Sequence, residues 1–373
     1  MKKKIAFLLQ NLEGGGAERV VLNILNSINL DIFDVSLILI ENRGVYLEQL
    51  KNRSGLDVVT FSNICKSRHI NFIVNYLRAL IFLKRQGYSV IFSQYNPGKL
   101  LGFFKFLYKG QNLIYRETNI PQAENKSRKF YLQILNKIFY KYGINNYEQI
   151  IVQSEDMKVS LLRIAGQIKK KISLINNPID CNFIEKQLSE LNGSKNIFTL
   201  PNAIRLISIG RLSYQKGYDL LIKTVSDLKD KTVELVILGE GIDKNKLEKL
   251  IDNYKLGNKV KLIGFKKNPY KYIAQADYFI SSSRFEGFPN AVLEACACGV
   301  PVIANNYTGG IKEIINSDVN GVIINIESVK EFSESLSKVY NSETIKKDIK
   351  NRFSVEKIVA EYENLFLKVL RGA

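Results

Sequence analysis

The segment from Arg284 to Ala295 combines two carboxylates with the start of a helix. Glu286 lies just before Pro289, a residue favoured at the first helical position, and Glu294 lies about a turn and a half into that helix. Carboxylates accept hydrogen bonds from sugar hydroxyls, and they offset positive charge on a carbon that is losing its leaving group. The free amides of a helix start can bind phosphate. The segment predicts a polar ligand site, although two glutamates at this spacing are by themselves typical of surface charges.

Two cations form a second group, in the segment from Gly210 to Gly217. Arg211 and Lys216 follow a predicted strand, and Lys216 opens a helix that we expect over residues 216–228. Side chains at such a turn can converge on one diphosphate. A lysine in the first turn of a helix opposes the helix dipole, which is a local cost. This placement favours phosphate binding over a purely solubilising surface position.

A glycine-rich turn from Asn11 to Arg19 follows the first predicted strand. Gly15 and Gly16 would let the backbone approach a ligand closely, and the dipole of the next helix favours an anion. The spacing is not the G-x-G-x-x-G dinucleotide fingerprint, and no G-x-x-x-x-G-K-[ST] loop occurs in the chain. Hydride-transfer and P-loop chemistries therefore lose support.

These three segments follow strands in a repeating pattern. Short β-branched apolar runs alternate with longer stretches of helical periodicity, which predicts parallel sheets with helices on both faces. The predicted strands are 4–9, 35–40, 58–61, 90–93, 113–115, 149–153, 205–210, 234–238, 260–263, 278–281, 300–304 and 321–324. Each sheet should carry its site at the carboxyl ends of its strands.

The length of 373 residues indicates two domains, because one core rarely serves more than about 250 to 300 residues. An Asn-Pro turn at 177–178 predicts the hinge. We expect one domain over residues 1–178, a second over 179–354 and a terminal helix over 355–373. The ligand should lie between the two domains.

The composition excludes several classes of protein. A hydrophobic content of 46% with only 7 prolines is that of a folded chain, and no apolar run approaches the roughly 20 residues of a membrane span. Four cysteines are too sparse for a disulfide framework. One histidine and no Asp-x-Asp pair offer no metal site. We expect a cytoplasmic protein without a catalytic metal.

Positive charge is concentrated in the first half of the chain. Residues 1–180 hold 26 lysines and arginines against 13 acidic residues, and the whole chain has a net charge of +18. This asymmetry predicts an anionic partner, although a lysine-rich surface kept for solubility is the alternative. The basic residues between positions 99 and 142 are Lys99, Lys105, Lys109, Arg116, Lys126, Arg128, Lys129, Lys137 and Lys141.

Aromatic residues are interleaved with this basic stretch. The segment from Gly98 to Lys109 could therefore rest as a helix in an anionic membrane interface. Two alternatives stay open: the aromatics are core positions of two ordinary helices, or the surface binds nucleic acid. The second has no recognisable binding motif to support it.

In their order along the chain, these segments resemble the nucleotide-sugar-dependent glycosyltransferases of GT-B fold, specifically the large retaining family 4. The marks are Gly-Gly-Ala-Glu-Arg at 15–19, Asn-Pro-Ile-Asp at 177–180, Gly-Arg-Leu at 210–212 with Lys-Gly at 216–217, the glutamates 286 and 294, Gly-Val-Pro-Val-Ile at 299–303 and Gly-Gly at 309–310. The resemblance covers essentially the whole chain. It implies an α/β protein with two doubly wound Rossmann-like domains that face each other across a cleft.

The resemblance implies a role for each part. The N-terminal domain would bind the acceptor, the C-terminal domain would bind the nucleotide sugar, and the terminal helix would pack back on the N-terminal domain. Arg211 and Lys216 would clamp the donor diphosphate, Glu286 would contact the transferred sugar and assist catalysis with these two cations, and Glu294 would bind the ribose hydroxyls. The other implied substrate-binding residues are Gly15, Gly16, Gly264, Phe265, Gly287, Phe288, Pro289 and Asn290. The resemblance implies no metal or other cofactor.

The chain departs from many relatives at the acceptor side, where they carry a histidine. Here the strand end reads Tyr-Arg-Glu-Thr-Asn-Ile-Pro over 115–121. Arg116 and Glu117 could face the cleft and bind substrate, or they could form a strand-end salt bridge. His69, the only histidine, is expected to begin a surface helix. The donor phosphate itself could then accept the proton of the acceptor hydroxyl.

We therefore expect a retaining, metal-independent hexosyltransferase. It would move a hexose or N-acetylhexosamine from a UDP-linked sugar to a lipid-linked saccharide in the assembly of a surface polysaccharide such as O-antigen or capsule. It would bind the anionic inner face of the plasma membrane peripherally through its basic N-terminal domain, and it would not bind nucleic acid. The alternatives are an epimerase of the same fold and a catalytically idle basic module that binds a nucleotide or a membrane. The segment 286–294 argues against the first, and intact Arg211 and Lys216 argue against the second.

Overall fold

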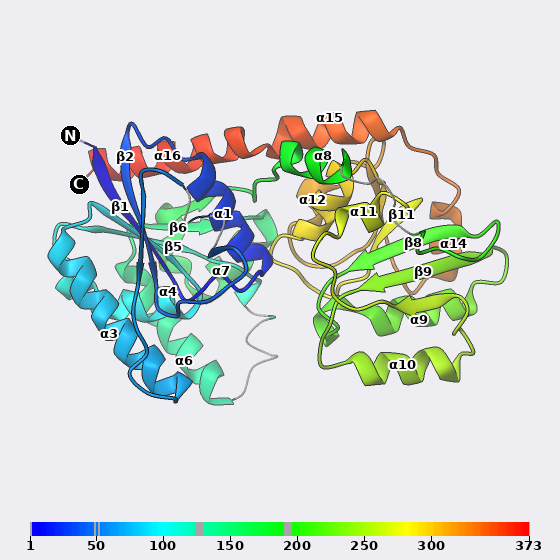
Figure 1. Ribbon diagram of the computed structural model, residues 1–373, viewed down its shortest axis with the longest axis horizontal. Helices are drawn as coiled ribbons and strands as arrows, with labels where there is room; N and C mark the ends of the chain where they lie inside the picture. The colour runs from blue at the N-terminus through cyan, green and yellow to red at the C-terminus, as the bar shows by residue number, and fades with distance from the viewer. Residues whose placement is uncertain are drawn as a thin grey trace. The chain divides into compact units, whose positions relative to one another are not determined.

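The computed structural model describes residues 2–47, 50, 53–121, 123, 130–189 and 196–372. It divides into two compact units (Figure 1), unit 1 formed by Met1–Pro178 with Val355–Ala373 and unit 2 by Ile179–Ser354. Each unit has one parallel sheet with helices on both faces, which confirms the predicted α/β class. All twelve predicted strands are present, with ends shifted by at most two residues.

Unit 1 has a seven-stranded sheet in the order β3-β2-β1-β4-β5-β6-β7. Its strands are β1 (Lys3–Leu9), β2 (Phe33–Leu39), β3 (Leu56–Thr60), β4 (Val90–Gln94), β5 (Asn112–Arg116), β6 (Gln149–Val152) and β7 (Ile172–Leu174). Its helices are α1 (Gly16–Ser27), α3 (Arg68–Gln86), α4 (Tyr95–Leu101), η1 (Gly102–Leu107), α6 (Phe130–Lys141), η2 (Gly143–Asn146), α7 (Glu155–Ile164), η3 (Gly166–Lys171) and α16 (Val355–Arg371). The η elements are 3-10 helices.

The strands of unit 1 are buried on both faces, because successive side chains point to opposite sides of the sheet. In β1, Phe7 belongs to a core shared with α1 and α16, whereas Leu8 belongs to a core shared with α3, α4 and α6. Helix α16 reaches this sheet through Tyr362 and Phe366, whose rings lie 6.2 and 6.4 Å from that of Phe92.

Unit 2 has a six-stranded sheet in the order β10-β9-β8-β11-β12-β13. Its strands are β8 (Ile204–Ile209), β9 (Val233–Leu238), β10 (Val260–Leu262), β11 (Tyr278–Ser281), β12 (Val302–Asn305) and β13 (Gly321–Ile324). Its helices are α8 (Cys181–Ser189), η4 (Tyr214–Lys216), α9 (Tyr218–Asp227), α10 (Lys244–Asn253), α11 (Tyr270–Ile273), α12 (Asn290–Ala297), α13 (Ile311–Ile314), α14 (Val329–Ser335) and α15 (Ser342–Phe353). In both sheets the order reverses beside the first strand, which is where such sheets bind ligands.

Two sequence predictions about helices are wrong. The helix expected over 216–228 begins only at Tyr218, because Gly217 takes a left-handed conformation with φ of 63° and ends the 3-10 turn that carries Lys216. The expected membrane-surface helix at 98–109 is instead the end of α4 followed by η1. In the described part of the chain, none of the helices is long and apolar enough to cross a membrane.

Candidate functional site

The site of unit 2 centres on an ion pair between Lys216 and Glu286. Lys216 follows β8 and Glu286 follows β11, and these two strands are neighbours, so the two residues meet at one edge of the sheet. Lys216 Nζ lies 2.5 Å from Glu286 Oε1, and the side chains are only 21% and 10% exposed. Because this ion pair is mostly buried, removal of either partner would leave the charge of the other one poorly solvated.

Gln215 and Ser283 fix the orientation of the Glu286 carboxylate. Gln215 Nε2 donates to Glu286 Oε2 at 3.2 Å, and Ser283 Oγ donates to Oε1 at 2.8 Å. With Lys216, three donors therefore hold one carboxylate, and charge-assisted bonds of this kind are the strong ones. No local motif indicates a role for Gln215 or Ser283, although Gln215 precedes Lys216 and Ser283 precedes Arg284.

Arg284 and Asp219 join the two loops that carry this pair. Arg284 donates from both terminal nitrogens to the two Asp219 oxygens at 2.8 Å each, and its guanidinium lies 4.1 Å from the ring centroid of Tyr214. Its backbone N–H donates to Gln215 O at 2.8 Å. Burial raises the pKa of Asp219, but the hydrogen bonds and charge of Arg284 outweigh this and lower that pKa below its usual value. The pair thus holds the turn before Lys216 in place.

Two glycines let backbone segments approach at this site. A Cβ on Gly217 would lie 2.1 Å from Ser282 O, and a Cβ on Gly309 would lie 1.8 Å from Glu286 O. Both also have positive φ, of 63° and 137°. Any other residue would separate the loops, so these glycines set the position of Lys216 and Glu286.

Arg211 lies exposed beyond the end of β8. Its guanidinium has no ion-pair or hydrogen-bond partner among the residues that the structure describes. Phe265, which follows β10, is 72% exposed, and Gly264 before it has φ of 72°. An unpaired guanidinium can take a phosphate, and an exposed ring can stack on a planar group.

Helix α12 starts where the sequence predicted, with Pro289 as its N-cap and Asn290 as its first residue. Gly287 O accepts from the N–H of Gly310 at 2.9 Å. The side chains of Phe288 and Glu294 are almost completely buried, at 7% and 6% exposed. Whether any of these residues contacts a ligand stays a prediction.

Two buried phenols flank the ion pair. Burial raises the pKa values of Tyr218 and Tyr307, and the negative charge of Glu286 raises both further. Both shifts favour the protonated phenols. A cavity of about 10 Å³ that Ser208, Lys216 and Tyr218 help to line has room for about one water molecule, so it cannot hold a sugar.

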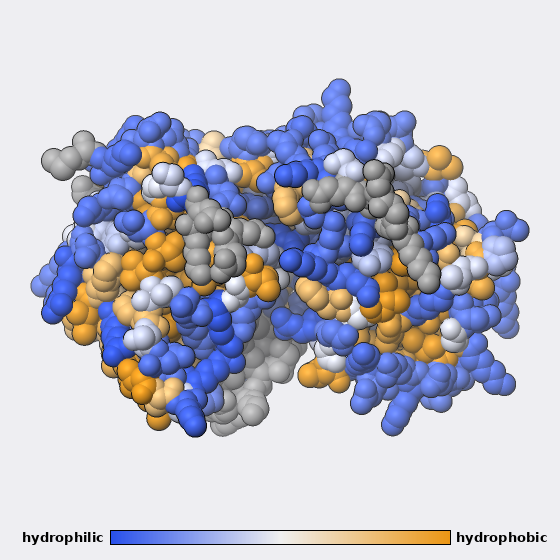
Figure 2. Space-filling view, in the orientation of Figure 1, coloured by the Kyte–Doolittle hydropathy of each residue, from blue (hydrophilic) through white to orange (hydrophobic). Residues whose placement is uncertain are grey.

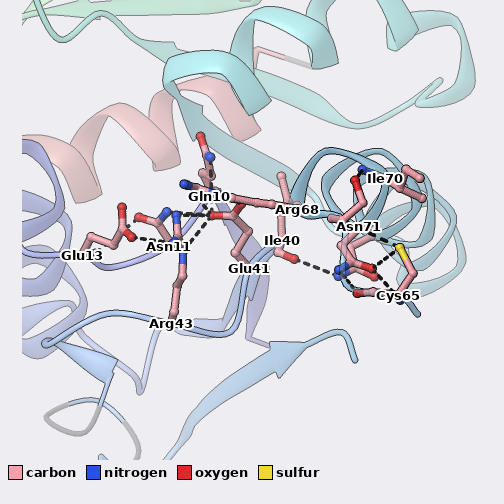
Figure 3. A network of polar contacts seen from close by, with 12 residues as sticks. Gln10, Asn11, Glu13, Ile40, Glu41, Arg43, Cys65, Arg68, Ile70 and Asn71 are labelled. Atoms are coloured by element: carbon pink, nitrogen blue, oxygen red, sulfur yellow. Dashed lines mark hydrogen bonds and ion pairs between the residues drawn. The ribbon is translucent and has the colours of Figure 1, made fainter. Parts of the chain in front are cut away.

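In unit 1, polar side chains at the carboxyl ends of β1 and β2 converge on Glu41 (Figure 3). Asn11 Nδ2 donates to its carboxylate at 2.9 Å, and the Nε atoms of Arg43 and Arg68 donate at 3.0 Å each. Arg43 also pairs with Glu13 at 2.9 Å. No motif pointed to this network, because its members are spread over almost sixty positions of the sequence.

The glycine-rich turn of unit 1 opens α1, with Gly15 as its N-cap and Gly16 as its first residue. A Cβ on Gly15 would lie 2.2 Å from Glu18 Oε2. The carboxylate of Glu18 thus covers this helix start and neutralises part of its dipole, so an anionic ligand would have to compete with it. Contact of Gly15 or Gly16 with a diphosphate stays a prediction.

The predicted roles of Arg116 need correction. Arg116 is only 1% exposed and donates to Gln94 Oε1 at 2.9 Å, Asn177 Oδ1 at 2.5 Å and the Tyr362 hydroxyl at 3.2 Å. These neutral groups take up the guanidinium, so it does not form a salt bridge with Glu117. Its burial leaves no surface for a substrate in this structure, and its contacts instead tie the hinge residue Asn177 and helix α16 to the sheet of unit 1.

Glu117 is equally buried, at 1% exposed. It accepts from the Tyr140 hydroxyl at 2.6 Å and from the backbone N–H of Thr118 at 3.0 Å. It follows Arg116 directly, and neighbouring residues at a strand end point to opposite faces of the sheet. This explains why the two charged side chains do not meet.

The other reactive side chains have structural positions. His69 is exposed in the first turn of α3, as predicted, and Ser67 caps that helix. Cys296 lies on α12 and Cys298 is its C-cap, and both are buried in the core of unit 2, which confirms them as packing residues. Burial also raises the pKa of both thiols. The described residues contain no group of three or more His, Cys, Asp or Glu side chains that could hold a metal.

The basic stretch expected to face a membrane is partly turned inward. Lys99 is 7% exposed and donates to Asn136 Oδ1 at 3.0 Å, and Lys105 pairs with Glu148 at 2.6 Å. Among its aromatics, Tyr108, Phe139 and Tyr140 are core residues. The alternative of core aromatics is therefore right for these three. Lys126, Arg128 and Lys129 lie outside the described residues.

Two family models match the chain in succession. The model of glycosyltransferase family 4 matches residues 14–183, and the model of glycosyl transferases group 1 matches residues 195–354. The chain is 26% identical to the N-acetylgalactosamine-N,N'-diacetylbacillosaminyl-diphospho-undecaprenol 4-alpha-N-acetylgalactosaminyltransferase of Campylobacter jejuni, over 94% of this chain and 93% of that protein. It is 28% identical to the O-antigen biosynthesis glycosyltransferase WclY of Escherichia coli, over 54% of this chain and 57% of that protein.

Solved structures share the fold over the full length. Anabaena HepE in complex with UDP superposes with a TM-score of 0.76, covering 99% of this chain and 100% of that one, at 20% identity. Sucrose-phosphate synthase from Thermosynechococcus elongatus gives a TM-score of 0.78 with complete coverage of both chains, at 16% identity. At these identities the likeness concerns the fold alone.

Proposed function

Because the chain belongs to the group 1 glycosyltransferases, glycosyltransferase family 4, we propose that it is a retaining, metal-independent hexosyltransferase. Its donor is a hexose or N-acetylhexosamine linked to UDP, and its acceptor is a saccharide carried on a lipid diphosphate. The bound UDP of HepE supports the donor, and the diphospho-undecaprenol in the name of the Campylobacter relative supports the acceptor. The name of WclY supports a place in the synthesis of surface polysaccharide.

The observation that carries this proposal is the arrangement of three charges at one edge of the unit 2 sheet. Arg211 is exposed and unpaired among the described residues, while Lys216 is held 2.5 Å from Glu286. A donor diphosphate binds Arg211 first and then draws Lys216 toward itself, because two phosphates offer the lysine more negative charge than one carboxylate. This exchange frees Glu286 to accept a hydrogen bond from a hydroxyl of the transferred sugar.

The reaction then needs only charge stabilisation and a proton acceptor. The bond from the anomeric carbon to the diphosphate oxygen breaks, and a bond to the acceptor oxygen forms on the same face, so the configuration is retained. The proton of the acceptor hydroxyl moves to the departing diphosphate. Arg211 and Lys216 stabilise the negative charge that grows on that group, and Glu286 offsets the positive charge on the sugar carbon. Glu294 binds the ribose hydroxyls, and Phe265 stacks near the base.

Unit 1 binds the acceptor in this proposal, with Glu41 and its two arginines as the polar groups at the matching strand ends. The enzyme works at the inner face of the plasma membrane, on which its acceptor is anchored. The net charge of +13 over residues 1–180 supports attraction to anionic lipid.

A transfer assay tests the proposal. The purified protein is incubated with a panel of UDP-sugars and a lipid-diphosphate saccharide, with EDTA present, and the anomeric configuration of the product is determined by NMR. One UDP-sugar should be used with retention. Inversion, or activity that requires added Mg²⁺ or Mn²⁺, would refute the proposed mechanism, and no transfer with any donor and acceptor tried would count against the activity itself.

A further inference from the structure

Helix α3 has an apolar stripe on its outer face. Ile70, Ile73, Leu77 and Ile81 are 50%, 59%, 49% and 54% exposed. Their spacing of three and four residues places them on one side of the helix, opposite the buried face that packs on the sheet of unit 1. A surface helix of a globular protein normally presents polar residues to water. The exposed apolar stripe of α3 therefore indicates a surface that binds a partner.

The charges of α3 all have one sign. The helix contains Arg68, Arg78, Lys84 and Arg85 and no acidic residue. Arg68 is bound to Glu41, and Arg78 donates to the backbone carbonyl of residue 62 at 3.1 Å. Within the described chain, Lys84 and Arg85 have no ion-pair partner, and both are exposed at the end of the helix.

More exposed apolar residues lie in the layer of helices that contains α3. Phe103 and Phe106 of η1 are 38% and 66% exposed, and Leu135 of α6 is 58% exposed. Helix α3 contacts the end of η1 directly, because the Tyr108 hydroxyl donates to Leu80 O at 2.9 Å. Figure 2 shows hydrophobic residues in orange, interspersed with blue, along the edge of unit 1 where Figure 1 draws α3.

We propose that the outer face of α3, with the exposed phenylalanines of η1, is the surface through which this protein lies on an anionic membrane. The four apolar side chains of α3 enter the boundary between headgroups and acyl chains, and Lys84 and Arg85 bind lipid phosphates. A lipid surface fits both features at once, because it is apolar below and negatively charged above. This inference rests on the proposed function. It replaces the stretch from Gly98 to Lys109 as the membrane contact, because in that stretch Lys99 is buried and Lys105 is paired with Glu148.

Vesicle co-sedimentation tests this assignment. The variants are I73S/L77S, which removes the centre of the stripe, and K84Q/R85Q, which removes the free charges. Their matched controls lie in unit 2: I242S/V339S exchanges residues that are 93% and 95% exposed, and K223Q/K229Q exchanges two exposed lysines. All the exchanged side chains are exposed, so the variants should fold, and their melting temperatures verify it.

We expect the wild type to bind vesicles of phosphatidylcholine with phosphatidylglycerol better than vesicles of phosphatidylcholine alone. I73S/L77S should weaken that binding at least tenfold at every salt concentration. K84Q/R85Q should weaken it mainly at low salt, because salt screens the charges that it removes. Both controls should bind like the wild type. Unchanged binding by I73S/L77S, or an absence of binding by the wild type, would overturn the assignment.

Two further measurements separate this inference from the proposed enzyme. Transfer to a short-chain, water-soluble acceptor should be unchanged in I73S/L77S, while transfer to a long-chain acceptor in vesicles should fall at least tenfold. A loss with both acceptors would show that the stripe is not a membrane contact alone and would overturn it. A self-association that I73S/L77S abolishes, seen by sedimentation velocity, would assign the stripe to a second copy of the chain instead. If the wild type binds vesicles through α3 but transfers no sugar, the enzyme proposal fails and the membrane surface stands.

Discussion

The carboxyl ends of the strands in the two sheets are built differently. In unit 2, Lys216, Glu286 and Arg284 come from two short segments, and glycines beside them let those segments meet. In unit 1, Glu41 gathers donors from residues as far apart as 10 and 68, and Arg116 is sealed among neutral groups. Unit 2 therefore carries a compact site built from neighbouring segments, whereas unit 1 gathers polar groups around Glu41 from distant segments and keeps Arg116 buried.

The free charges also differ between the two strand ends. Arg211 has no partner within the described residues of unit 2, so a negatively charged ligand can bind it without first breaking an ion pair. In unit 1, Arg43 and Arg68 are both bound to Glu41, and Arg43 also pairs with Glu13. A site for a diphosphate therefore fits unit 2 better. The following changes test whether unit 2 binds the donor and unit 1 the acceptor.

The largest effect should come from Glu286→Gln. An amide cannot offset positive charge on the sugar carbon, so kcat should fall by roughly 100-fold or more, while UDP affinity should stay equal or rise because Lys216 loses its counter-ion. Steady-state kinetics measure kcat, and calorimetry measures the UDP affinity. Glu343→Gln, on the exposed surface of α15, is the control. Turnover at the wild-type rate would remove Glu286 from the reaction.

Lys216→Ala should mainly weaken the binding of UDP. UDP affinity should fall at least tenfold, about 1.4 kcal/mol, because the diphosphate loses one of two cations. Lys223→Ala, a lysine on the outer surface of α9, is the matched control and should bind UDP normally. Equal affinities for the two variants would show that Lys216 does not contact the diphosphate.

Glu41→Gln should affect the acceptor and spare the donor. The neutral side chain no longer holds Arg43 and Arg68, so the KM for the acceptor should rise severalfold while the UDP affinity stays unchanged. Kinetics with varied acceptor at saturating donor measure the first value. A fall in UDP affinity as large as that of Lys216→Ala would break the division between the two strand ends.

The smallest effect concerns stability in acid. The pKa of Asp219 is lowered in the folded state, so its carboxylate stabilises the fold above its unfolded pKa of about 3.9 and loses this contribution as the pH falls through the lower, folded value. Asp219→Asn should lower the melting temperature at pH 7 by roughly 2 to 4 °C, and it should lose less stability than the wild type between pH 5 and pH 3. Melting temperatures are measured by calorimetry for both proteins. A difference between them that stays the same from pH 5 to pH 3 would contradict the stabilising role of the Asp219 carboxylate.

The strands could be predicted from the sequence because buried parallel strands consist of short runs of Val, Ile and Leu between helical segments. The three-residue edge strand β7 is not among the predicted strands, because it is half-buried and follows three lysines. The predicted start of α9 is wrong because Gly217 takes a left-handed conformation and lies against Ser282, which is 65 positions away. Local patterns contain no information on such an approach.

The site could be predicted only in part, for the same reason. Lys216 and Glu286 stood out through their local motifs, but their direct pairing joins residues 70 positions apart. The contacts of Arg116 and Glu117 could not be predicted, because their partners Tyr362 and Tyr140 lie on helices that sequence patterns do not place against β5. The Glu41 network was missed entirely, because polar residues brought together by different strand ends share no spacing.

Calorimetric titration of the wild type with UDP, GDP and ADP in the presence of EDTA tests whether unit 2 binds a nucleotide without metal. We expect micromolar binding of UDP, weaker binding of the other two nucleotides, and no change in these affinities when Mg²⁺ replaces EDTA. Binding that appears only with the metal, or no binding of any nucleotide, would contradict a metal-independent nucleotide-sugar site built on Arg211 and Lys216.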